Sequence, residues 1–218
     1  MVAQPVHILI IEDHALVTES YKTILHSIEE QDFVVDVALN CDATLERLMA
    51  KSFNLILLDI QLPASSDRKF LDGEDLGIFI RKHQPEAKIL VITAIAEPLR
   101  IESVFKYIDP EGFIIKSDVN SRDVRLAIQQ LLRGRTFFSS STNPYRRLPK
   151  SSRELIDDYD RKILYHLSLG EKTKDLQKFV PLSKRGIEER KVKLRDLFGI
   201  DKNSETNLIK EAKKRNII

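Results

Sequence analysis

Five short apolar runs in the first half of the chain have the length and composition of buried β-strands. Between them, apolar residues recur every three to four positions, as over residues 15–30 and 121–134, which is typical of amphipathic helices. Strict alternation of strands and helices predicts a parallel sheet with helices on both faces. We therefore expect a doubly wound five-stranded α/β domain over residues 1–138. Its strands are expected at residues 6–11, 33–38, 54–59, 88–93 and 112–116.

The second half of the chain has no strand-like run. Ser, Thr, Asn and Pro dominate residues 139–153, which predicts a linker. Four segments with helical spacing follow, and Gly170 and Gly199 are typical helix stop signals. Residues 154–218 are therefore expected to form a small all-α domain of four helices.

Charge separates the two halves. Residues 144–218 carry 20 Lys or Arg against 12 Asp or Glu, whereas residues 1–143 carry 15 against 21. This asymmetry indicates different partners for the two domains, and nucleic acid is the usual partner of a basic domain. Two solvated surfaces of uneven charge would give the same counts, so charge alone leaves both interpretations open.

Several features indicate a cytoplasmic protein. A single cysteine, Cys41, excludes an internal disulfide and fits a reducing compartment. The apolar runs are all far shorter than the roughly 18 residues of a membrane span. The N-terminus lacks the basic segment and the cleavage site of a signal peptide. No membrane partner is expected.

Polar residues stand where the predicted strands end. Glu12 and Asp13 follow the first strand, Asp59 ends the third, Thr93 the fourth and Lys116 the fifth. In an open parallel sheet, ligands bind outside the carboxyl ends of the strands, so these side chains should meet at one edge. Carboxylates at such short distances repel one another, and a bound divalent cation would relieve this repulsion. A site whose ligands are all oxygen atoms favours Mg²⁺.

This set of residues suits phosphoryl transfer. Asp59 could attack phosphorus and form an acyl phosphate, while Lys116 and the Thr93 hydroxyl stabilise the equatorial oxygens. Taken singly, Asp59 could cap a strand end, Lys116 could form an ordinary salt bridge, and Thr93 could bond to backbone. Their joint placement favours the phosphoryl site.

With Pro63 and Phe113 added, the pattern resembles a two-component response-regulator receiver domain, which has a flavodoxin-like fold. The resemblance implies that Asp59 is the phosphoacceptor and that Thr93 and Phe113 form the switch. It implies a Mg²⁺ site made by Glu12, Asp13, Asp59 and the backbone carbonyl of Gln61. It further implies a sensor histidine kinase or phosphotransfer protein as donor, and a homodimer when phosphorylated. Such a protein is a stoichiometric phosphoacceptor with slow self-dephosphorylation, not an enzyme.

One spacing departs from that family. A glycine that opens the third helix should follow the phosphoacceptor closely, but Gly73 comes fourteen residues after Asp59. The loop over residues 63–77 is therefore several residues too long. It could gate phosphoryl transfer, or it could be a tolerated insertion, because the cost of closing a loop grows slowly with its length.

Residues 156–217 resemble a LuxR-type (NarL/FixJ-type) helix-turn-helix effector, with the recognition helix at residues 184–198. Ser183 is a good N-cap for that helix. Its candidate DNA-contacting residues are Lys184, Arg185, Arg190, Lys191 and Lys193. The family commonly has Thr-Val-Lys-x-His where this chain has residues 186–190, so Glu188 replaces a DNA-contacting lysine. Gln177 replaces a small alanine at the tight helix crossing.

The sequence thus favours a phosphorylation-controlled transcription regulator that binds DNA. A second hypothesis keeps the receiver but gives the C-terminal domain a protein partner, as Gly186 and Glu188 suggest. A third is a phosphatase of the haloacid dehalogenase type, which usually has a second aspartate where this chain has Gln61.

Overall fold

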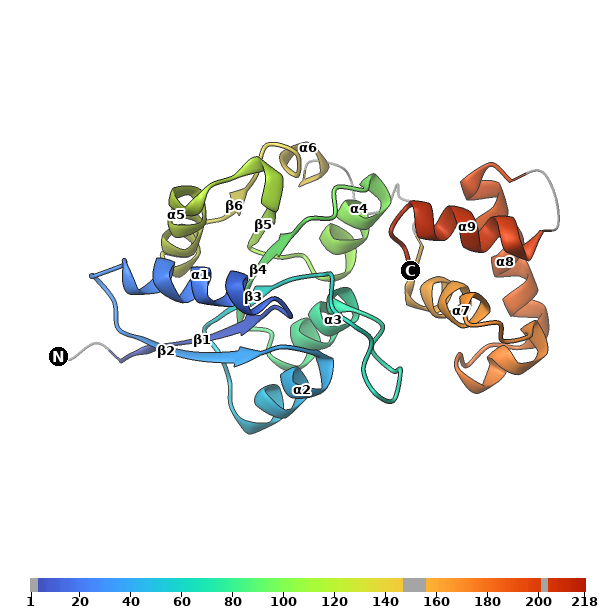
Figure 1. Ribbon diagram of the computed structural model, residues 1–218, viewed down its shortest axis with the longest axis horizontal. Helices are drawn as coiled ribbons and strands as arrows, with labels where there is room; N and C mark the ends of the chain where they lie inside the picture. Colours follow the sequence, from blue (N-terminus) through green and yellow to red (C-terminus); the bar gives the residue numbers. More distant parts are fainter. Residues whose placement is uncertain (1–3, 147–155, 201–203) are drawn as a thin grey trace. The chain divides into compact units, whose positions relative to one another are not determined.

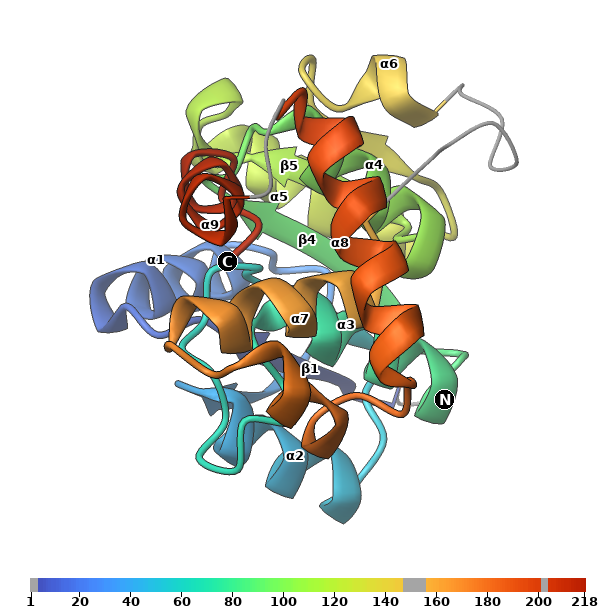
Figure 2. The same cartoon turned by 90° about the vertical axis from the view of Figure 1, so that its right-hand side faces the viewer.

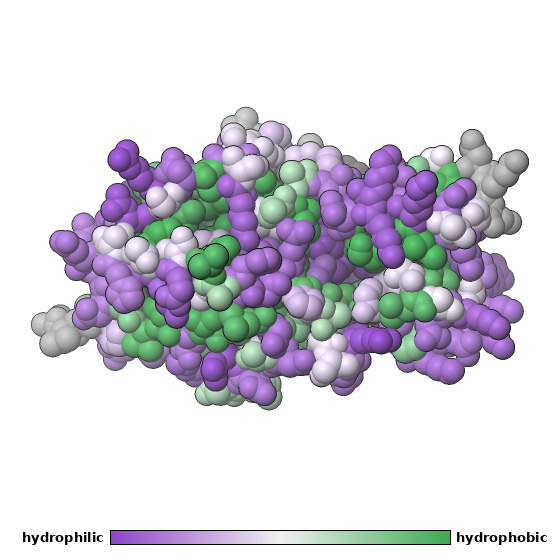
Figure 3. All heavy atoms as spheres, viewed as in Figure 1, coloured by the Kyte–Doolittle hydropathy of each residue, from purple (hydrophilic) through white to green (hydrophobic). Residues whose placement is uncertain are grey.

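The computed structural model describes residues 4–146, 156–200 and 204–218 (Figures 1 and 2). The chain divides into two compact units, a sheet-containing N-terminal part and a helical C-terminal part, which are described separately. Hydrophilic side chains cover much of the visible surface, with apolar atoms between them (Figure 3). Within the described residues, no helix combines the length and apolarity needed to cross a bilayer.

The N-terminal part contains one parallel sheet with the strand order β2-β1-β3-β4-β5-β6. In β3 every residue is buried, and Leu58 pairs with Ile11 of β1 and Val91 of β4, so the carboxyl ends of the central strands lie side by side. The strands are β1 (Val6–Ile11), β2 (Phe33–Ala38), β3 (Leu55–Leu58), β4 (Lys88–Thr93), β5 (Gly112–Ile115) and β6 (Phe137–Phe138).

Helices cover both faces of this sheet, as the strand–helix alternation predicts. Alternate strand residues such as Ile8 and Leu90 form a core with Leu25 and Ile128 from α1 and α5. Phe113 faces the opposite side, where Phe105 of α4 packs against it. The helices are α1 (Ala15–His26), α2 (Cys41–Ala50), α3 (Gly73–His83), α4 (Pro98–Tyr107) and α5 (Ser121–Leu132).

The sheet has six strands, so the expectation of five was wrong by one. Strand β6 has only two residues and pairs with β5 through Phe113 and Phe138, which is too short a run to give a period of two in the sequence. Residues 139–146, expected to begin the linker, continue from β6 and include the short helix α6 (Asn143–Arg146). The rest of the expected linker, 147–153, lies outside the described residues.

Residues 139–142 are tied to β5 by hydrogen bonds. The Ser139 backbone N–H and the Thr142 hydroxyl both donate to the Phe113 carbonyl, at 3.0 Å each. Ser139 Oγ accepts from the Ile115 N–H at 3.1 Å. Both side chains are buried, so these bonds are shielded from water. The polar composition that predicts a linker here serves instead to satisfy buried backbone groups.

The C-terminal part contains α7 (Asp158–Ser168), the 3₁₀ helix η3 (Thr173–Lys178), α8 (Lys184–Phe198) and α9 (Glu205–Lys214). Three of the four expected helices are therefore α-helical, and the second is a six-residue 3₁₀ helix. It lies between Gly170, which has φ 86°, and Pro181, which leaves little length for an α-helix. Gln177, expected at a tight crossing, is exposed and donates to the Leu182 carbonyl.

Helix α8 has the bounds expected for the recognition helix. Ser183 caps its N-terminus by accepting from the Gly186 N–H at 3.1 Å, as predicted. Gly199 ends it in the left-handed conformation, with φ 69°. Its inner face carries Ile187 and Leu194, which are fully buried. The helix is thus held on one side and exposes the other.

Candidate functional site

The carboxyl edge of the sheet brings Asp59 beside Glu12. The Asp59 N–H donates to the Ile11 carbonyl at 2.9 Å, which extends the β1–β3 pairing by one residue. Asp59 is 4% exposed and Glu12 is fully buried. Two buried carboxylates next to each other are costly unless cations or hydrogen bonds compensate them.

Lys116 supplies that compensation. Its Nζ lies 2.7 Å from Asp59 Oδ2 and 2.8 Å from Glu12 Oε2, so a single ammonium group bonds both carboxylates. Burial opposes the charged form of Lys116, but the two carboxylates outweigh it and raise its pKa. The Gln61 backbone N–H donates to the other oxygen of Asp59 at 2.9 Å. Asp59 is therefore held in one orientation from both sides.

A group of possible metal ligands adjoins this pair. Ligand atoms of Glu12, Asp13 and His14 lie within 4.8 Å of one another. His14 Nδ1 is 3.0 Å from Glu12 Oε1 and 2.8 Å from Asp13 Oδ1. The hydrogen bond to Glu12, followed by the charge of Asp13, raises the pKa of His14. Glu12 joins this group to Asp59, because Lys116 bonds both of those carboxylates.

These residues fit a hard divalent cation. Glu12, Asp13 and Asp59 present three carboxylates, and Lys116 is the ammonium group bonded within them. Such an oxygen-rich site with excess negative charge is the chemistry that Mg²⁺ prefers. His14 was not predicted to belong to this group, although its place directly after the acidic pair was a signal for it.

Thr93 and Phe113 occupy the positions expected from the strand order. Thr93 ends β4, is 1% exposed, and its Oγ1 accepts from the Ile95 N–H at 3.2 Å. It pairs with Ile115, the residue before Lys116. Phe113 is buried, and its ring lies 5.5 Å from that of Phe105. The aromatic side chain is therefore already turned inward in this structure.

Gly73 reaches the site despite its distance in sequence. A Cβ atom at this position would lie 1.9 Å from the carbonyl oxygen of Asp59, and the Gly73 N–H donates to the Ile60 carbonyl at 3.0 Å. Gly73 thus opens α3 directly against the backbone of Asp59. The extra residues are confined to 63–72, because residues from 73 onward belong to α3.

The loop over residues 63–72 has a structure of its own. The Ser65 N–H donates to the Phe70 carbonyl at 2.8 Å, and Ser65 Oγ bonds Asp67 Oδ1 at 2.8 Å. Phe70 packs edge-to-face on Phe79 of α3, with centroids 5.4 Å apart. The Ser66 N–H donates to Asp42 of α2. These internal contacts agree with the hypothesis that the loop is a tolerated insertion.

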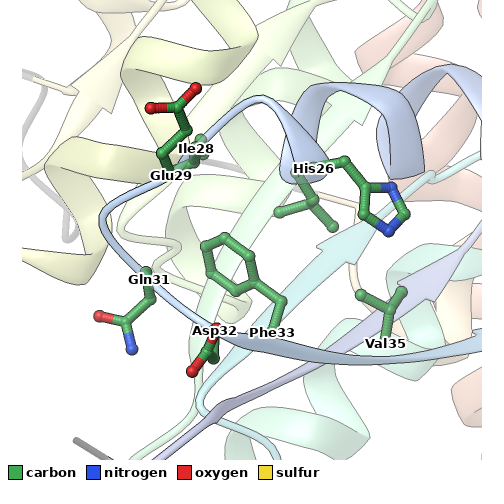
Figure 4. A pocket seen from close by; sticks show the side chains of 8 residues that line it. His26, Ile28, Glu29, Gln31, Asp32, Phe33 and Val35 are labelled. Atoms are coloured by element: carbon green, nitrogen blue, oxygen red, sulfur yellow. The ribbon is translucent and has the colours of Figure 1, made fainter.

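A cavity of about 300 Å³ lies at the opposite edge of the sheet, where α1 ends and β2 begins (Figure 4). Phe33 stands at its centre, and the carboxylates of Glu29 and Asp32 point away from that ring. The cavity contains none of the predicted site residues and offers no converging polar groups. It is therefore not the functional site.

Residues 8–129 match the family model of the response regulator receiver domain. The chain belongs to this family. Over nearly its whole length it is similar to the Fimbriae Z protein of Escherichia coli K12, with 24% identity over 215 residues, covering 96% of this chain and 97% of that protein. It is also 26% identical over 137 residues to the transcriptional regulatory protein RcsB of Salmonella typhi, covering 63% of this chain and 61% of RcsB.

Solved structures agree with the fold of this response regulator. RcsB of Salmonella enterica serovar Typhimurium, bound to promoter P1flhDC with a beryllofluoride phosphomimetic, aligns with a TM-score of 0.63 and 20% identity, covering 95% of this chain and 98% of that one. The isolated receiver domain of the same protein aligns with a TM-score of 0.57 and 23% identity, covering 65% of this chain and 99% of that one. The order of receiver and helical effector is thus shared.

Two of the predicted DNA contacts in the C-terminal part of this response regulator are bound within the protein. Arg190 Nη1 lies 2.7 Å from both carboxylate oxygens of Asp157 and 2.8 Å from Asp160. Lys191 is buried and donates to Thr173 at 2.8 Å and to Glu205. Both side chains are engaged in contacts between helices of the protein, and their role in DNA contact stays a prediction.

The other predicted contacts are more accessible. Lys184 and Arg185 are exposed in the first turn of α8, and Arg185 pairs with Glu189 at 2.7 Å. Lys193 is 3.8 Å from Asp160. Lys184 and Arg185 in the first turn of α8, together with Lys193, are therefore the exposed cations of the predicted set.

Proposed function

We propose that this response regulator accepts a phosphoryl group on Asp59 and uses its C-terminal part to bind DNA. The observation that carries the first half is the contact of Lys116 with both Asp59 and Glu12 at the buried edge of the sheet. An ammonium bonded to a buried nucleophilic carboxylate is poised to neutralise charge on an attached phosphoryl group.

In the proposed reaction an oxygen of Asp59 forms a bond to phosphorus while the bond from phosphorus to the donor breaks. The donor's leaving group takes up a proton. Lys116 then shares its hydrogen bonds between Glu12 and the new phosphoryl oxygens, and the Thr93 hydroxyl at the neighbouring strand end donates to them. Glu12, Asp13 and the Gln61 carbonyl would hold Mg²⁺, which when bound neutralises further phosphoryl charge.

The donor is proposed to be a sensor histidine kinase or a phosphotransfer protein, and the protein a stoichiometric acceptor that loses the group slowly. To test this, the protein is mixed with acetyl phosphate and Mg²⁺, and its mass is followed. One phosphoryl group should be added to the wild type and to the control Asp32→Asn, whose side chain is exposed, but none to Asp59→Asn. Labelling that persists in Asp59→Asn would remove the assignment. Multiple turnover of a small phosphate ester, tested separately, would point to the phosphatase hypothesis instead.

DNA binding is supported by the similarity to regulators described as DNA-bound and by the exposed cations that open α8. A homodimer formed on phosphorylation would place two C-terminal parts on half-sites about one helical turn apart. The test is a titration of random-sequence duplexes at two salt concentrations, with and without beryllofluoride. Lys184→Ala/Arg185→Ala should weaken binding, whereas Lys213→Ala/Lys214→Ala, at exposed positions ending α9, is the control.

One observation favours a protein partner as a second candidate. Arg185, Glu189, Val192 and Asp196 lie on one exposed face of α8, at spacings of four, three and four residues. Arg185 is neutralised by Glu189, so this face is acidic and partly apolar where a DNA-reading face would be cationic. Failure to bind any duplex at low salt would favour this candidate.

A further inference from the structure

His14 brings an imidazole to the acidic edge of the sheet, and the function proposed above does not use it. It is the residue before α1, where Ser, Thr, Asp or Asn usually cap a helix, and its side chain makes no capping hydrogen bond. The ring faces two carboxylates instead, with Nδ1 3.0 Å from Glu12 Oε1 and 2.8 Å from Asp13 Oδ1. Helix formation therefore does not account for the placement of this ring.

The two oxygens of Glu12 face different neighbours. Oε2 accepts from Lys116, which also bonds Asp59. Oε1 accepts from the backbone N–H of His14 at 3.3 Å and faces the His14 ring. The ligand atoms of Glu12, Asp13 and His14, here called the 12–14 triad, all lie within 4.8 Å of one another, and Asp59 does not belong to this group. The triad is thus a set of possible ligands distinct from the phosphoacceptor.

One oxygen of the 12–14 triad lacks a hydrogen-bond donor. Asp13 Oδ1 is shielded from solvent and accepts no hydrogen bond from the described residues, although His14 Nδ1 stands 2.8 Å away. A nitrogen and an oxygen at this distance, without the alignment of a hydrogen bond, leave a lone pair of the oxygen unused. A buried polar atom in this state requires an explanation, and a bound cation is one that suits a carboxylate.

Charge and ligand type both favour a divalent transition metal ion. Lys116 is one ammonium beside the carboxylates of Glu12, Asp13 and Asp59, so with a neutral imidazole this edge keeps an excess of negative charge. An imidazole nitrogen favours ions such as Zn²⁺ over Mg²⁺. Zn²⁺ has bonds of about 2.0–2.2 Å to nitrogen and oxygen, which place neighbouring ligand atoms roughly 3.0–3.5 Å apart. Small rotations of the Asp13 and His14 side chains would therefore admit it.

We propose that the 12–14 triad binds a divalent transition metal ion of the Zn²⁺ class, with the His14 imidazole as the ligand that selects it over Mg²⁺. The His14 side chain is 70% exposed, so water can complete the coordination. Because Glu12 and Asp13 also serve the proposed Mg²⁺ position, the two ions compete, and the transition metal opposes phosphorylation of Asp59. That competition rests on the proposed function, whereas the metal site itself does not.

The first arm of the test measures Zn²⁺ binding to the full-length protein at about pH 8, where histidine is ordinarily neutral. Competition with a chromogenic chelator gives the Kd, and the ¹⁵N signals of the histidine rings locate the ion. The Nδ1 signal of His14 should shift saturably with Zn²⁺ and not with Mg²⁺. His14→Asn should raise the Zn²⁺ Kd at least about tenfold, because the loss of even a supporting group around a metal costs that much. The control His26→Asn removes an exposed histidine outside the triad and should bind as the wild type does.

The variant Asp59→Asn separates the 12–14 triad from the phosphoryl site. It should weaken Mg²⁺ binding but affect the Zn²⁺ Kd far less than His14→Asn does, because Asp59 lies outside the triad. A larger loss of Zn²⁺ affinity in Asp59→Asn than in His14→Asn would assign the ion to the phosphoryl site. An equal Zn²⁺ Kd in His14→Asn and the wild type would leave His14 as an ion-pair partner only. Either result overturns the proposal, as does the absence of a saturable His14 shift.

The last arm tests the competition by adding Zn²⁺ during phosphorylation of the protein by acetyl phosphate in Mg²⁺. Zn²⁺ should slow the labelling of the wild type and have a weaker effect on His14→Asn. Equal slowing of both proteins would refute the competition. A wild type that is not labelled even without Zn²⁺ would refute the proposed function, while the Zn²⁺ Kd values still decide the metal site.

Discussion

Gly73 lies against the carbonyl oxygen of Asp59, so closely that any Cβ at position 73 would stand 1.9 Å from it. Two non-bonded heavy atoms cannot approach that closely. The obstructing atom is the backbone oxygen of Asp59, which cannot rotate away as a side chain could. The contact fixes the end of the 63–72 loop to Asp59, the proposed phosphoacceptor. A long loop can therefore leave the site and return to it without displacing α3.

Gly73→Ala is expected to destabilise the N-terminal part by about 1–3 kcal/mol, the usual cost of overpacking. It should also slow phosphorylation by acetyl phosphate, because Asp59 must move with its carbonyl. Urea unfolding and mass spectrometry measure the two effects. Gly186→Ala is the control, since a Cβ there meets nothing closer than 3.5 Å; it should stabilise α8 by up to about 1 kcal/mol. Equal unfolding free energies and equal phosphorylation rates in the two variants would contradict the close contact between Gly73 and Asp59.

Arg190→Ala is expected to destabilise the C-terminal part by about 3 kcal/mol, because removing one partner leaves a buried charge uncompensated. Asp160 is fully buried, and burial raises its pKa against the effect of the bonds from Arg190. Denaturation followed by the amide signals of this part measures the loss. Arg185→Ala, which breaks an exposed pair, should cost less than about 1 kcal/mol.

It follows that Arg190 is a poor probe of DNA contact. Weaker DNA binding by Arg190→Ala would report unfolding of the helices that it joins. The Lys184 and Arg185 variants avoid this ambiguity, because those side chains are exposed and the ion pair of Arg185 with Glu189 lies within one helix.

The junction of α8 and α9 should weaken in acid. The hydrogen bond from Lys191, more than any other cause, lowers the pKa of Glu205. A carboxyl with a lowered folded pKa contributes stability that is present above its unfolded pKa of about 4.3 and is lost as the pH falls through the folded value. Glu205 is 47% exposed, so the contribution should be below about 1 kcal/mol.

Glu205→Gln should accordingly reduce stability at pH 7 and have little effect at a pH below the lowered pKa of Glu205, where the wild-type carboxyl is protonated as well. Thermal unfolding at both pH values measures the difference. The same loss at both would show that Glu205 acts by packing and not by charge.

The 63–72 loop should resist trypsin although Arg68 and Lys69 are exposed within it. Ser65 holds its two ends, since its backbone bonds Phe70 and its hydroxyl bonds both Asp67 and the Phe70 N–H. Ser65→Ala removes the hydroxyl contacts and should speed cleavage by about fivefold, equivalent to roughly 1 kcal/mol of local opening. Ser66→Ala, with an exposed side chain, is the matched control.

Strands β1 to β5 and the residues at their carboxyl ends could be predicted because both follow from local pattern. Apolar runs mark parallel strands, and parallel strands bring their ends to one edge. Lys116 and Asp59 therefore meet although 57 residues separate them. The prediction of Asp59 and its partners needed no knowledge of individual distances.

The pairing of Arg190 with Asp157 could not be predicted in that way. The two residues are 33 positions apart on different helices, and their contact depends on how those helices cross. A cation on a predicted recognition helix looks the same in sequence whether it faces a phosphate or a neighbouring carboxylate. Strand β6 was missed for a different reason, because two residues carry no periodicity.

The bonds of Ser139 and Thr142 to Phe113 have a mechanical consequence. Phe113 and Ile115 belong to β5, and Lys116 follows that strand directly. The chain that leaves β6 is therefore bonded to a residue only three positions before the ammonium that bonds Asp59. We expect a displacement of β5 that accompanies phosphorylation of Asp59 to move residues 139–142 with it, because these bonds join them. The segment that leaves the receiver sheet is thus coupled through β5 to the side chains around Asp59.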